Sequence, residues 1–307
     1  MENILITGVT GFVGTHFVRH FRNDPKVKLF GHSRKLRVTD DVMTYLPEYG
    51  SDVLIEKKVT SFIHLAGIAH DLSNVYKPED YYRVNLEGTR KAVDEFLKSD
   101  ARHFIFVSSI KAVCDVASTA ADESWKPDPQ TDYGKSKRLA EEYILSLKWP
   151  ADKKFYILRP AMMHGAGNKG NLNVLYKYAK SGLPFPFGAF YNQRSFHSIE
   201  NFSFIIEQLL RRDIPSGVYH LADDGYLSAT QLYELICEAL HVTPRVWKIK
   251  AQWIETLASL MGKRQMVSKL TENMMVSNKK IVNALGEPLH LSLIDGLIKT
   301  IMAFDGK

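Results

Sequence analysis

A tyrosine and a lysine that together could move a proton occur in one short run of the chain. Tyr133 and Lys137 are four residues apart in the run Tyr-Gly-Lys-Ser-Lys, so on a helix they lie one turn apart on the same face. An ammonium group near a phenol favours the phenolate, and a tyrosine with a pKa of about 10 becomes useful near neutral pH only when such a charge lowers that pKa. The pair predicts acid–base chemistry at an oxygen atom.

Two serines come just before this run, at the end of an apolar strand predicted over residues 103–107. Ser108 and Ser109 therefore stand at the carboxyl end of the strand, where open α/β sheets bind their ligands. A Ser–Tyr–Lys set beside a nicotinamide transfers a proton to or from an oxygen while a hydride moves at its carbon. Spacing alone does not choose between these neighbours; the resemblance described below implies Ser109, with Ser108 as the fallback. A surface Tyr–Lys pair is the disfavoured alternative.

A glycine-rich loop near the start of the chain predicts a dinucleotide site. Gly8, Gly11 and Gly14 are spaced G-x-x-G-x-x-G between an apolar strand over residues 3–7 and a helix over residues 12–21. The first glycine allows a tight turn, the second lets backbone N–H groups approach a pyrophosphate, and the third lets helix and strand pack closely. The flanking strand and helix favour dinucleotide binding over a plain tight turn.

The end of the next strand, predicted over residues 27–31, indicates which dinucleotide is used. An acidic residue there would accept a hydrogen bond from the ribose 2′-hydroxyl of NAD, but this chain has His32, Ser33, Arg34 and Lys35. Cationic side chains pair with a 2′-phosphate, so NADP(H) is favoured and NAD(H) stays open. The alternative is that Arg34 and Lys35 are solvated loop charges.

Strands and helices alternate through the first half of the chain, which predicts a doubly wound parallel α/β sheet of the Rossmann type with a smaller C-terminal substrate-binding domain. Further strands are expected over residues 61–65 and 217–221, and helices over about 78–98, 131–147, 200–212, 229–240 and 251–261. We assign residues 1–160 and 195–222 to the dinucleotide-binding domain, and residues 161–194 and 223–307 to the substrate-binding domain. The third strand has no clear position within residues 36–58.

Composition excludes several classes of protein. With 307 residues, 45% hydrophobic and 24% charged, the chain is globular rather than fibrous or disordered. The net charge of +6 is modest and reads as spread along the chain, which argues against a nucleic-acid arm. Two cysteines, no basic leader and no apolar run of about 18 residues predict a cytoplasmic protein without a membrane span. The histidines show no metal-ligand spacing, so no metal is expected.

These motifs, together with His64-Leu65-Ala66-Gly67, Asn85-Leu86-Glu87-Gly88-Thr89 and Leu158-Arg159-Pro160, resemble the extended short-chain dehydrogenase/reductase family of NAD-dependent epimerases, dehydratases and ketoreductases. Softer similarities, such as Ser108-Ser109-Ile110-Lys111 and Lys169-Gly170-Asn171, point to bacterial UDP-N-acetylhexosamine 4-ketoreductases and 4-epimerases of surface-polysaccharide pathways. The resemblance implies that Tyr133 is the acid/base, Lys137 holds the nicotinamide ribose and Ser109 hydrogen-bonds the reacting oxygen.

The resemblance also implies two sets of binding residues. The cofactor set consists of Gly8, Gly11, Phe12, Val13, Gly14, Arg34, Leu65, Ala66, Gly67, Asn85, Ser108, Tyr133, Lys137 and Pro160. The substrate set consists of Ser109, Lys111, Asn171 and Arg194. Lys111 reads equally as a ligand contact or an exposed charge, and His64 and Asn85 read more as support for the backbone than as chemistry. His164 is expected in the pocket wall. Family members are often dimers through paired helices, so a homodimer is one expectation.

The leading functional prediction is an NAD(P)-dependent oxidoreductase that reduces carbon 4 of a UDP-4-keto-N-acetylhexosamine. The first alternative is a UDP-sugar 4-epimerase that keeps NAD bound, and a non-catalytic NADP-binding sensor is the alternative from another class. A sensor has no need of Tyr133 and Lys137. A dehydratase is disfavoured because it needs extra carboxylates near the serine, and the nearest, Asp115, is poorly placed.

Overall fold

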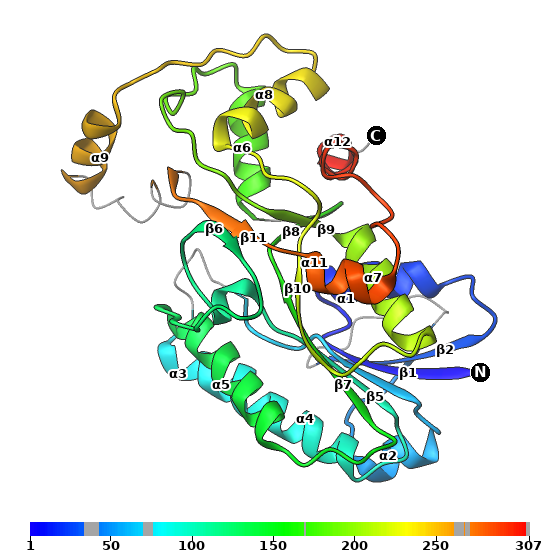
Figure 1. The fold of residues 1–307 in the computed structure, drawn as a ribbon. Helices are drawn as coiled ribbons and strands as arrows, with labels where there is room; N and C mark the ends of the chain where they lie inside the picture. The colour runs from blue at the N-terminus through cyan, green and yellow to red at the C-terminus, as the bar shows by residue number, and fades with distance from the viewer. Residues whose placement is uncertain (34–42, 70–75, 169, 261–266, 268–270, 305–307) are drawn as a thin grey trace.

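The computed structural model describes residues 1–33, 43–69, 76–168, 170–260, 267 and 271–304. Within them a parallel sheet forms the centre of the molecule (Figure 1). Its seven strands, in order across the sheet, are β10 (Gly217–Leu221), β7 (Lys154–Pro160), β5 (His103–Val107), β4 (Ser61–His64), β1 (Glu2–Thr7), β2 (Val27–His32) and β3 (Met43–Tyr45). The predicted Rossmann-type sheet is confirmed, and β3 gives the third strand its position.

Helices cover both faces of this sheet because each strand is apolar on both sides. One face packs against α1 (Phe12–Phe21), α7 (Ile199–Arg211) and α11 (Lys279–Leu285). The other packs against α2 (Ser51–Glu56), α4 (Gly88–Leu97) and α5 (Asp132–Ser146). As expected, α7 and β10 return to the main sheet after the excursion that follows β7, and β10 pairs in parallel with β7.

The helix expected over about residues 78–98 is interrupted. It consists of α3 (Pro78–Tyr81), a π-helical segment η1 (Tyr82–Glu87) and α4 in direct succession. A π turn widens the helix by one residue and is frequent at functional sites. Here it contains the buried Asn85, whose contacts are described below.

The order of the strands decides where a ligand can bind. β1 pairs with β2 on one side and with β4 on the other, so the direction of winding reverses between β1 and β4. In such a sheet the loops at the carboxyl ends of these two strands diverge and leave a crevice. The glycine loop follows β1, and Ser108 and Ser109 follow β5 on the same edge.

The remaining elements form a lobe above this edge (Figure 1). Two small parallel pairs connect it to the sheet: β8 (Met162–His164) with β9 (Phe196–Ser198), and β6 (Ala117–Ala121) with β11 (Met274–Val276). Helices α6 (Asn171–Lys180), α8 (Ala229–Ala239) and α12 (Leu293–Phe304) share an apolar core of their own. Helix α9 (Ala251–Leu260) stands apart from them. The exact division into two domains stays a prediction.

Candidate active site

A cleft of 610 Å³ lies at the carboxyl edge of the sheet, between the sheet and the lobe. Residues that follow β1, β4, β5 and β7 form one wall, together with the first turns of α1 and α5. The lobe contributes Gly170, Leu172, Arg194, Ser195 and Met274. The cleft thus lies where the strand order predicts a ligand.

The glycine loop is shaped for close backbone contacts. Gly8 has φ +72°, and a Cβ there would lie 2.7 Å from the backbone nitrogen of Ala66. A Cβ on Gly14 would lie 2.6 Å from the carbonyl oxygen of Val9, so only glycine lets α1 pack against the loop. Gly11 caps α1 without a side chain, and Phe12 and Val13 line the cleft. The N–H groups of this first turn are therefore open to an anion such as a pyrophosphate.

The structure brings Tyr133 and Ser109 together at the cleft wall. Thr131 caps α5 by accepting a hydrogen bond from the Gly134 N–H (3.1 Å), which places Tyr133 in the first turn. A Cβ on Gly134 would lie 2.3 Å from the carbonyl oxygen of Lys111, so this glycine lets α5 approach the segment after Ser109. Both Ser109 and Tyr133 line the cleft.

The pKa of Tyr133 differs in direction from the sequence-based expectation. Burial raises the pKa of the Tyr133 phenol, a hydrogen bond with Ser109 acts in the opposite direction, and Tyr81 adds to the rise. Lys137, whose Nζ donates to the Val107 carbonyl (2.8 Å), is not among the groups that shift the pKa of Tyr133. Ser109, rather than Lys137, is the group that favours the phenolate here.

Lys137 is buried, and it lines the cleft together with Tyr133. Its Nζ donates a hydrogen bond to the Val107 carbonyl (2.8 Å) and lies 4.8 Å from the centroid of the Phe106 ring. Burial lowers the pKa of Lys137 to about 8, with the nearby Glu141 carboxylate acting against that shift. A Cβ on Gly67 would lie 3.2 Å from Nζ, so this glycine makes room for the ammonium group.

Ser108 has a different environment from its neighbour Ser109. Its hydroxyl donates to Glu141 Oε1 at 2.5 Å. Glu141 also forms a bidentate ion pair with Arg159, whose Nε and Nη2 donate to Oε1 and Oε2 at 2.9 and 2.6 Å. All three side chains are buried. Ser108 lines the cleft, but its hydroxyl donates to a buried ion pair, which favours Ser109 and leaves Ser108 as the fallback.

Asn85 lies behind the cleft wall and not in it. Its Oδ1 accepts from the Ile68 N–H (2.8 Å), and its Nδ2 donates to the Ile68 carbonyl (3.1 Å) and to Ser136 Oγ (3.0 Å). The amide thereby fixes the turn that contains Gly67. Asn85 supports the backbone in this structure, as does His64, which is hydrogen-bonded to Thr7 Oγ1 (2.7 Å), and a contact between Asn85 and the cofactor stays a prediction.

Some of the other expected cofactor residues line the cleft, and one packs behind the glycine loop. Leu65, Gly67 and Pro160 line the cleft. Ala66 packs beside Gly8, and its N–H donates to Thr7 Oγ1 (3.3 Å). Arg34 lies outside the described residues.

Two expected substrate residues line the cleft with partners of their own. Lys111 Nζ donates to Asp115 Oδ1 (2.8 Å), so the lysine is an ion-paired wall residue and not a free surface charge. Arg194 Nη1 donates to the Glu272 carbonyl (2.9 Å). Asn171 is the first residue of α6, and its side chain lies outside what the structure describes.

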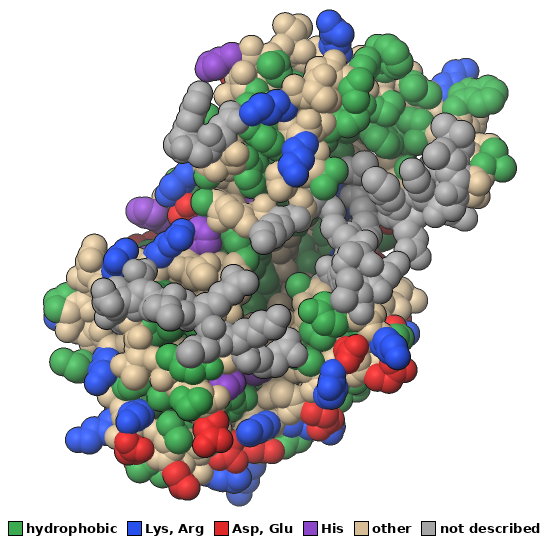
Figure 2. Space-filling model, turned by 180° about the vertical axis from the view of Figure 1, so that it is seen from behind, with side chains coloured by type: hydrophobic (Ala, Val, Ile, Leu, Met, Phe, Trp, Pro, Cys, Tyr) green, Lys and Arg blue, Asp and Glu red, His purple; other side chains and the backbone are tan. Residues whose placement is uncertain are grey.

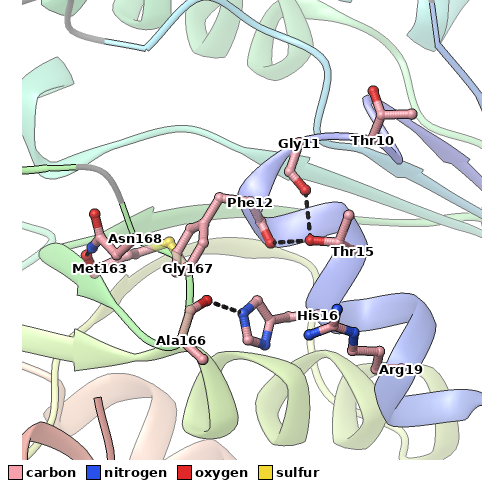
Figure 3. A pocket seen from close by; sticks show the side chains of 10 residues that line it. All are labelled: Thr10, Gly11, Phe12, Thr15, His16, Arg19, Met163, Ala166, Gly167 and Asn168. Atoms are coloured by element: carbon pink, nitrogen blue, oxygen red, sulfur yellow. Dashed lines mark hydrogen bonds between the residues drawn. The ribbon is translucent and has the colours of Figure 1, made fainter. Parts of the chain in front are cut away.

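A second pocket of 510 Å³ adjoins the cleft on the outer side of the glycine loop (Figure 3). Phe12 and Met163 line both cavities. His16 is hydrogen-bonded to the carbonyl oxygen of Ala166 (2.7 Å), which ties α1 to the loop after β8. Arg19 is exposed at the pocket's edge.

Comparison with known proteins identifies the family. The profile of the NAD dependent epimerase/dehydratase family matches residues 4–222, more than two thirds of the chain. The chain belongs to this family. It is therefore an enzyme of the NAD-dependent epimerase and reductase type, and the sequence resemblance is confirmed.

Relatives of this epimerase/dehydratase-family chain include two curated bacterial enzymes. A UDP-glucose 4-epimerase of Vibrio cholerae is 29% identical over 99% of this chain and 95% of its own length. An N-acetyl-alpha-D-glucosaminyl-diphospho-ditrans,octacis-undecaprenol 4-epimerase of Escherichia coli O157:H7 is 26% identical over 88% of this chain and 84% of its own length.

Solved structures share the fold over the whole chain. MoeE5 in complex with UDP-glucose and NAD superposes with a TM-score of 0.79 at 18% identity, covering 99% of both chains. The Bordetella bronchiseptica enzyme WbmG in complex with NAD has a TM-score of 0.79 at 16% identity, covering 99% of this chain and 94% of its own. At such identities the likeness establishes the fold alone.

Sequence reasoning missed Glu141, which is buried and pairs with Arg159 behind the cleft. It also missed three residues that line the cleft, Thr131, Met163 and Met274. Glu141 could have been found from its position, since it is one helical turn after Lys137. His164 is a correction: it is fully buried and bonded to Thr300 Oγ1 (2.9 Å), and it is not in the cleft wall. Across the described residues, no helix is long and apolar enough to span a membrane.

Proposed function

We propose that this protein binds a nicotinamide dinucleotide in the cleft and catalyses oxidation or reduction at carbon 4 of a sugar carried on a diphosphate. The observation that carries the proposal is the hydrogen-bonded Ser109–Tyr133 pair at the cleft wall. It faces the same cavity as the open N-terminus of α1, so an acid–base group and a pyrophosphate-binding loop serve one site.

The residues present fit such a cofactor. The first turn of α1 offers backbone donors to a pyrophosphate, and Gly8, Gly14 and Gly67 are positions where a Cβ would meet neighbouring atoms. When bound, the nicotinamide would supply the hydride acceptor or donor. Tyr133 would pass a proton between its phenol oxygen and the C4 oxygen, and Ser109 would hold both oxygens in line. Lys137, with a pKa lowered to about 8, would be available to a ribose hydroxyl.

Reduction of a 4-keto sugar with NADPH is the form of this reaction that we favour. The sequence from His32 to Lys35 contains no carboxylate to accept the ribose 2′-hydroxyl of NAD, and it contains two cations that suit a 2′-phosphate. Arg34 and Lys35 are outside the described residues, so this argument rests on their sequence.

A 4-epimerase is the second candidate, and the relatives favour it. The Vibrio cholerae enzyme, which matches nearly the full chain, is a UDP-glucose 4-epimerase. Such an enzyme would keep NAD bound, oxidise carbon 4 and reduce it from the other face. The same Ser109, Tyr133 and Lys137 would serve both reactions. A non-catalytic sensor is not supported, because the family is one of enzymes and the acid–base pair is formed.

The substrate's diphosphate would lie toward the lobe. Arg194 brings a cationic side chain to that side of the cleft, Lys111 brings one from the segment after β5, and Asn171 stands at the start of α6 beside the cleft. A guanidinium pairs with phosphate in a bidentate manner. We propose a UDP-sugar as the substrate. The polyprenol-linked sugar named for the Escherichia coli relative is the alternative, and it has the same diphosphate.

The cofactor that leaves with the purified protein tests the choice. A reductase should release little NAD and should oxidise NADPH stoichiometrically with a UDP-4-keto-6-deoxy-N-acetylhexosamine. Stoichiometric bound NAD, with interconversion of UDP-N-acetylglucosamine and UDP-N-acetylgalactosamine without added cofactor, would establish the epimerase instead. Absence of both activities would overturn the proposal.

Arg34→Ala tests the preference for NADPH. The affinity for NADPH should fall by about tenfold or more while that for NADH changes little, because a charge-assisted pair contributes about 1.5–3 kcal/mol. Arg102→Ala, an exposed arginine before β5, is the matched control. Equal losses for both cofactors would show that Arg34 is solvated.

A further inference from the structure

Two segments of the lobe are rich in positive charge. Residues 170–194 and 241–260 together contain six Lys and Arg against one Asp or Glu, whereas the whole chain contains 40 against 34. A basic patch on one part of a molecule indicates an anionic partner for that part.

The same part of the chain exposes large apolar side chains. In α9 the sequence places Trp253 and Leu260 on one helix face, and the structure leaves Trp253 70% and Leu260 81% exposed. A helix in a monomeric protein normally turns such a face inward. Here Trp253 and Leu260 are turned to solvent, on a helix that stands away from α6, α8 and α12 (Figure 1).

Trp247 is a further exposed aromatic residue, six residues before Trp253 in the chain, and it has cations near it in the sequence. The segment that contains it pairs with residues 185–188, through the Phe185 N–H to Arg245 carbonyl bond (2.7 Å) and the Trp247 N–H to Phe185 carbonyl bond (2.8 Å). Trp247 is 58% exposed on this paired segment. Exposed Arg245, Lys248 and Lys250 flank it.

We propose that this surface, formed by Trp247, Trp253, Leu260, Arg245, Lys248 and Lys250, binds the face of an anionic phospholipid membrane. Figure 2 shows hydrophobic side chains gathered over the lobe with Lys and Arg among them. Tryptophan rings prefer the depth of the lipid headgroups, and lysine and arginine beside them reach the phosphates. The protein would lie on the membrane and not cross it.

Charge decides between a membrane and a second copy of the chain. A dimer through this surface would set two strongly basic regions against each other, which repel. An anionic lipid surface attracts both, and each basic residue close to it strengthens binding by roughly fivefold. This inference goes beyond the proposed reaction and does not depend on it, because lipid binding is measured without substrate.

Sedimentation of the full chain with lipid vesicles tests the proposal. Wild type should pellet with vesicles of phosphatidylethanolamine and phosphatidylglycerol, should stay in solution with pure phosphatidylcholine, and should be released by high salt. Trp247→Ser/Trp253→Ser should weaken binding by about tenfold or more, since burial of the rings is lost. Ile55→Ser/Ile298→Ser, two exposed apolar residues elsewhere, should bind like wild type.

Charge-reversal variants measure the electrostatic contribution to vesicle binding. Lys248→Glu/Lys250→Glu should bind anionic vesicles at least about tenfold more weakly, whereas Lys126→Glu/Lys148→Glu, with the same net charge change, should bind nearly as well as wild type. Circular dichroism checks that each variant is folded, and turnover of a soluble UDP-sugar should be unchanged in all four.

Four results would overturn the proposal. The first is wild type that stays in solution with anionic vesicles. The second is a double tryptophan variant that pellets as well as wild type. The third is sedimentation velocity showing that the tryptophan substitutions dissociate a dimer. The fourth is capture of RNA in place of lipid, and the third and fourth would each assign the surface to a different partner. None of these results would alter the reaction proposed for the cleft.

Discussion

The wall of the cleft and the polar layer buried behind it are built from neighbouring residues of the same segments. Ser109 meets Tyr133 at the wall, while Ser108 turns its hydroxyl back to Glu141. Gly67 lines the wall, and Asn85 holds its turn from behind. The difference teaches that residues adjacent in sequence can have separate environments, since wall residues face the cavity and layer residues bond to one another behind it.

The largest effect is expected at the wall, from Tyr133→Phe. The substitution removes the phenolic proton but keeps the ring, so turnover should fall by about 10²–10⁴-fold. Cofactor affinity, measured by fluorescence titration, and thermal stability should remain close to wild type. Turnover within a few-fold of wild type would remove Tyr133 from the acid–base role.

The next effect is expected in the buried layer, from Glu141→Gln. This change leaves Arg159 as an uncompensated buried charge, so the free energy of unfolding should fall by about 3–5 kcal/mol. Urea denaturation measures it. The double variant Glu141→Leu/Arg159→Met should be less destabilised than Glu141→Gln, because it removes both charges. A double variant no better than the single one would show that the ion pair is not the cause.

Ser108 and Ser109 are neighbours in the sequence but have different hydrogen-bond partners, so a pair of alanine variants sharpens the comparison. Ser109→Ala should lower turnover by about tenfold, the loss of one hydrogen bond to the reacting groups, with stability nearly unchanged. Ser108→Ala should instead lower the free energy of unfolding by about 1.5 kcal/mol, since a charged carboxylate loses a donor, and should leave turnover within a few-fold. The reverse pattern would exchange the roles of the two residues.

The last prediction concerns the acid sensitivity of stability in the buried layer. Burial lowers the pKa of His64 to about 3, and the charge of Lys137 adds to that shift. In the unfolded chain His64 binds a proton as the pH falls through about 6.5, whereas in the folded protein it stays neutral until a much lower pH. The contribution of neutral His64 to the free energy of unfolding is therefore fully present above pH 6.5 and is lost progressively below it. Between pH 6.5 and pH 5 wild type should lose about 2 kcal/mol more than His64→Phe. Equal pH dependence in urea titrations of the two proteins would contradict this origin.

Much of the dinucleotide-binding half was predictable because local rules and the fold agree there. Strands apolar on both sides, helices with one apolar face and glycines at a strand–helix turn have the same meaning in any context. The order of the motifs also predicted the family. The π turn at Asn85 was not predictable, because a one-residue widening leaves the apolar periodicity nearly unchanged.

The sequence by itself determined which chemistry is available: Ser, Tyr and Lys at the end of one strand and on the next helix, beside a glycine loop. Only the tertiary structure decided how these groups are used. It turned Ser108 inward and Ser109 outward, because successive residues after a strand face opposite sides. It buried Lys137 against the Val107 carbonyl and left Tyr133 with a raised pKa, because desolvation depends on elements that pack from elsewhere in the chain.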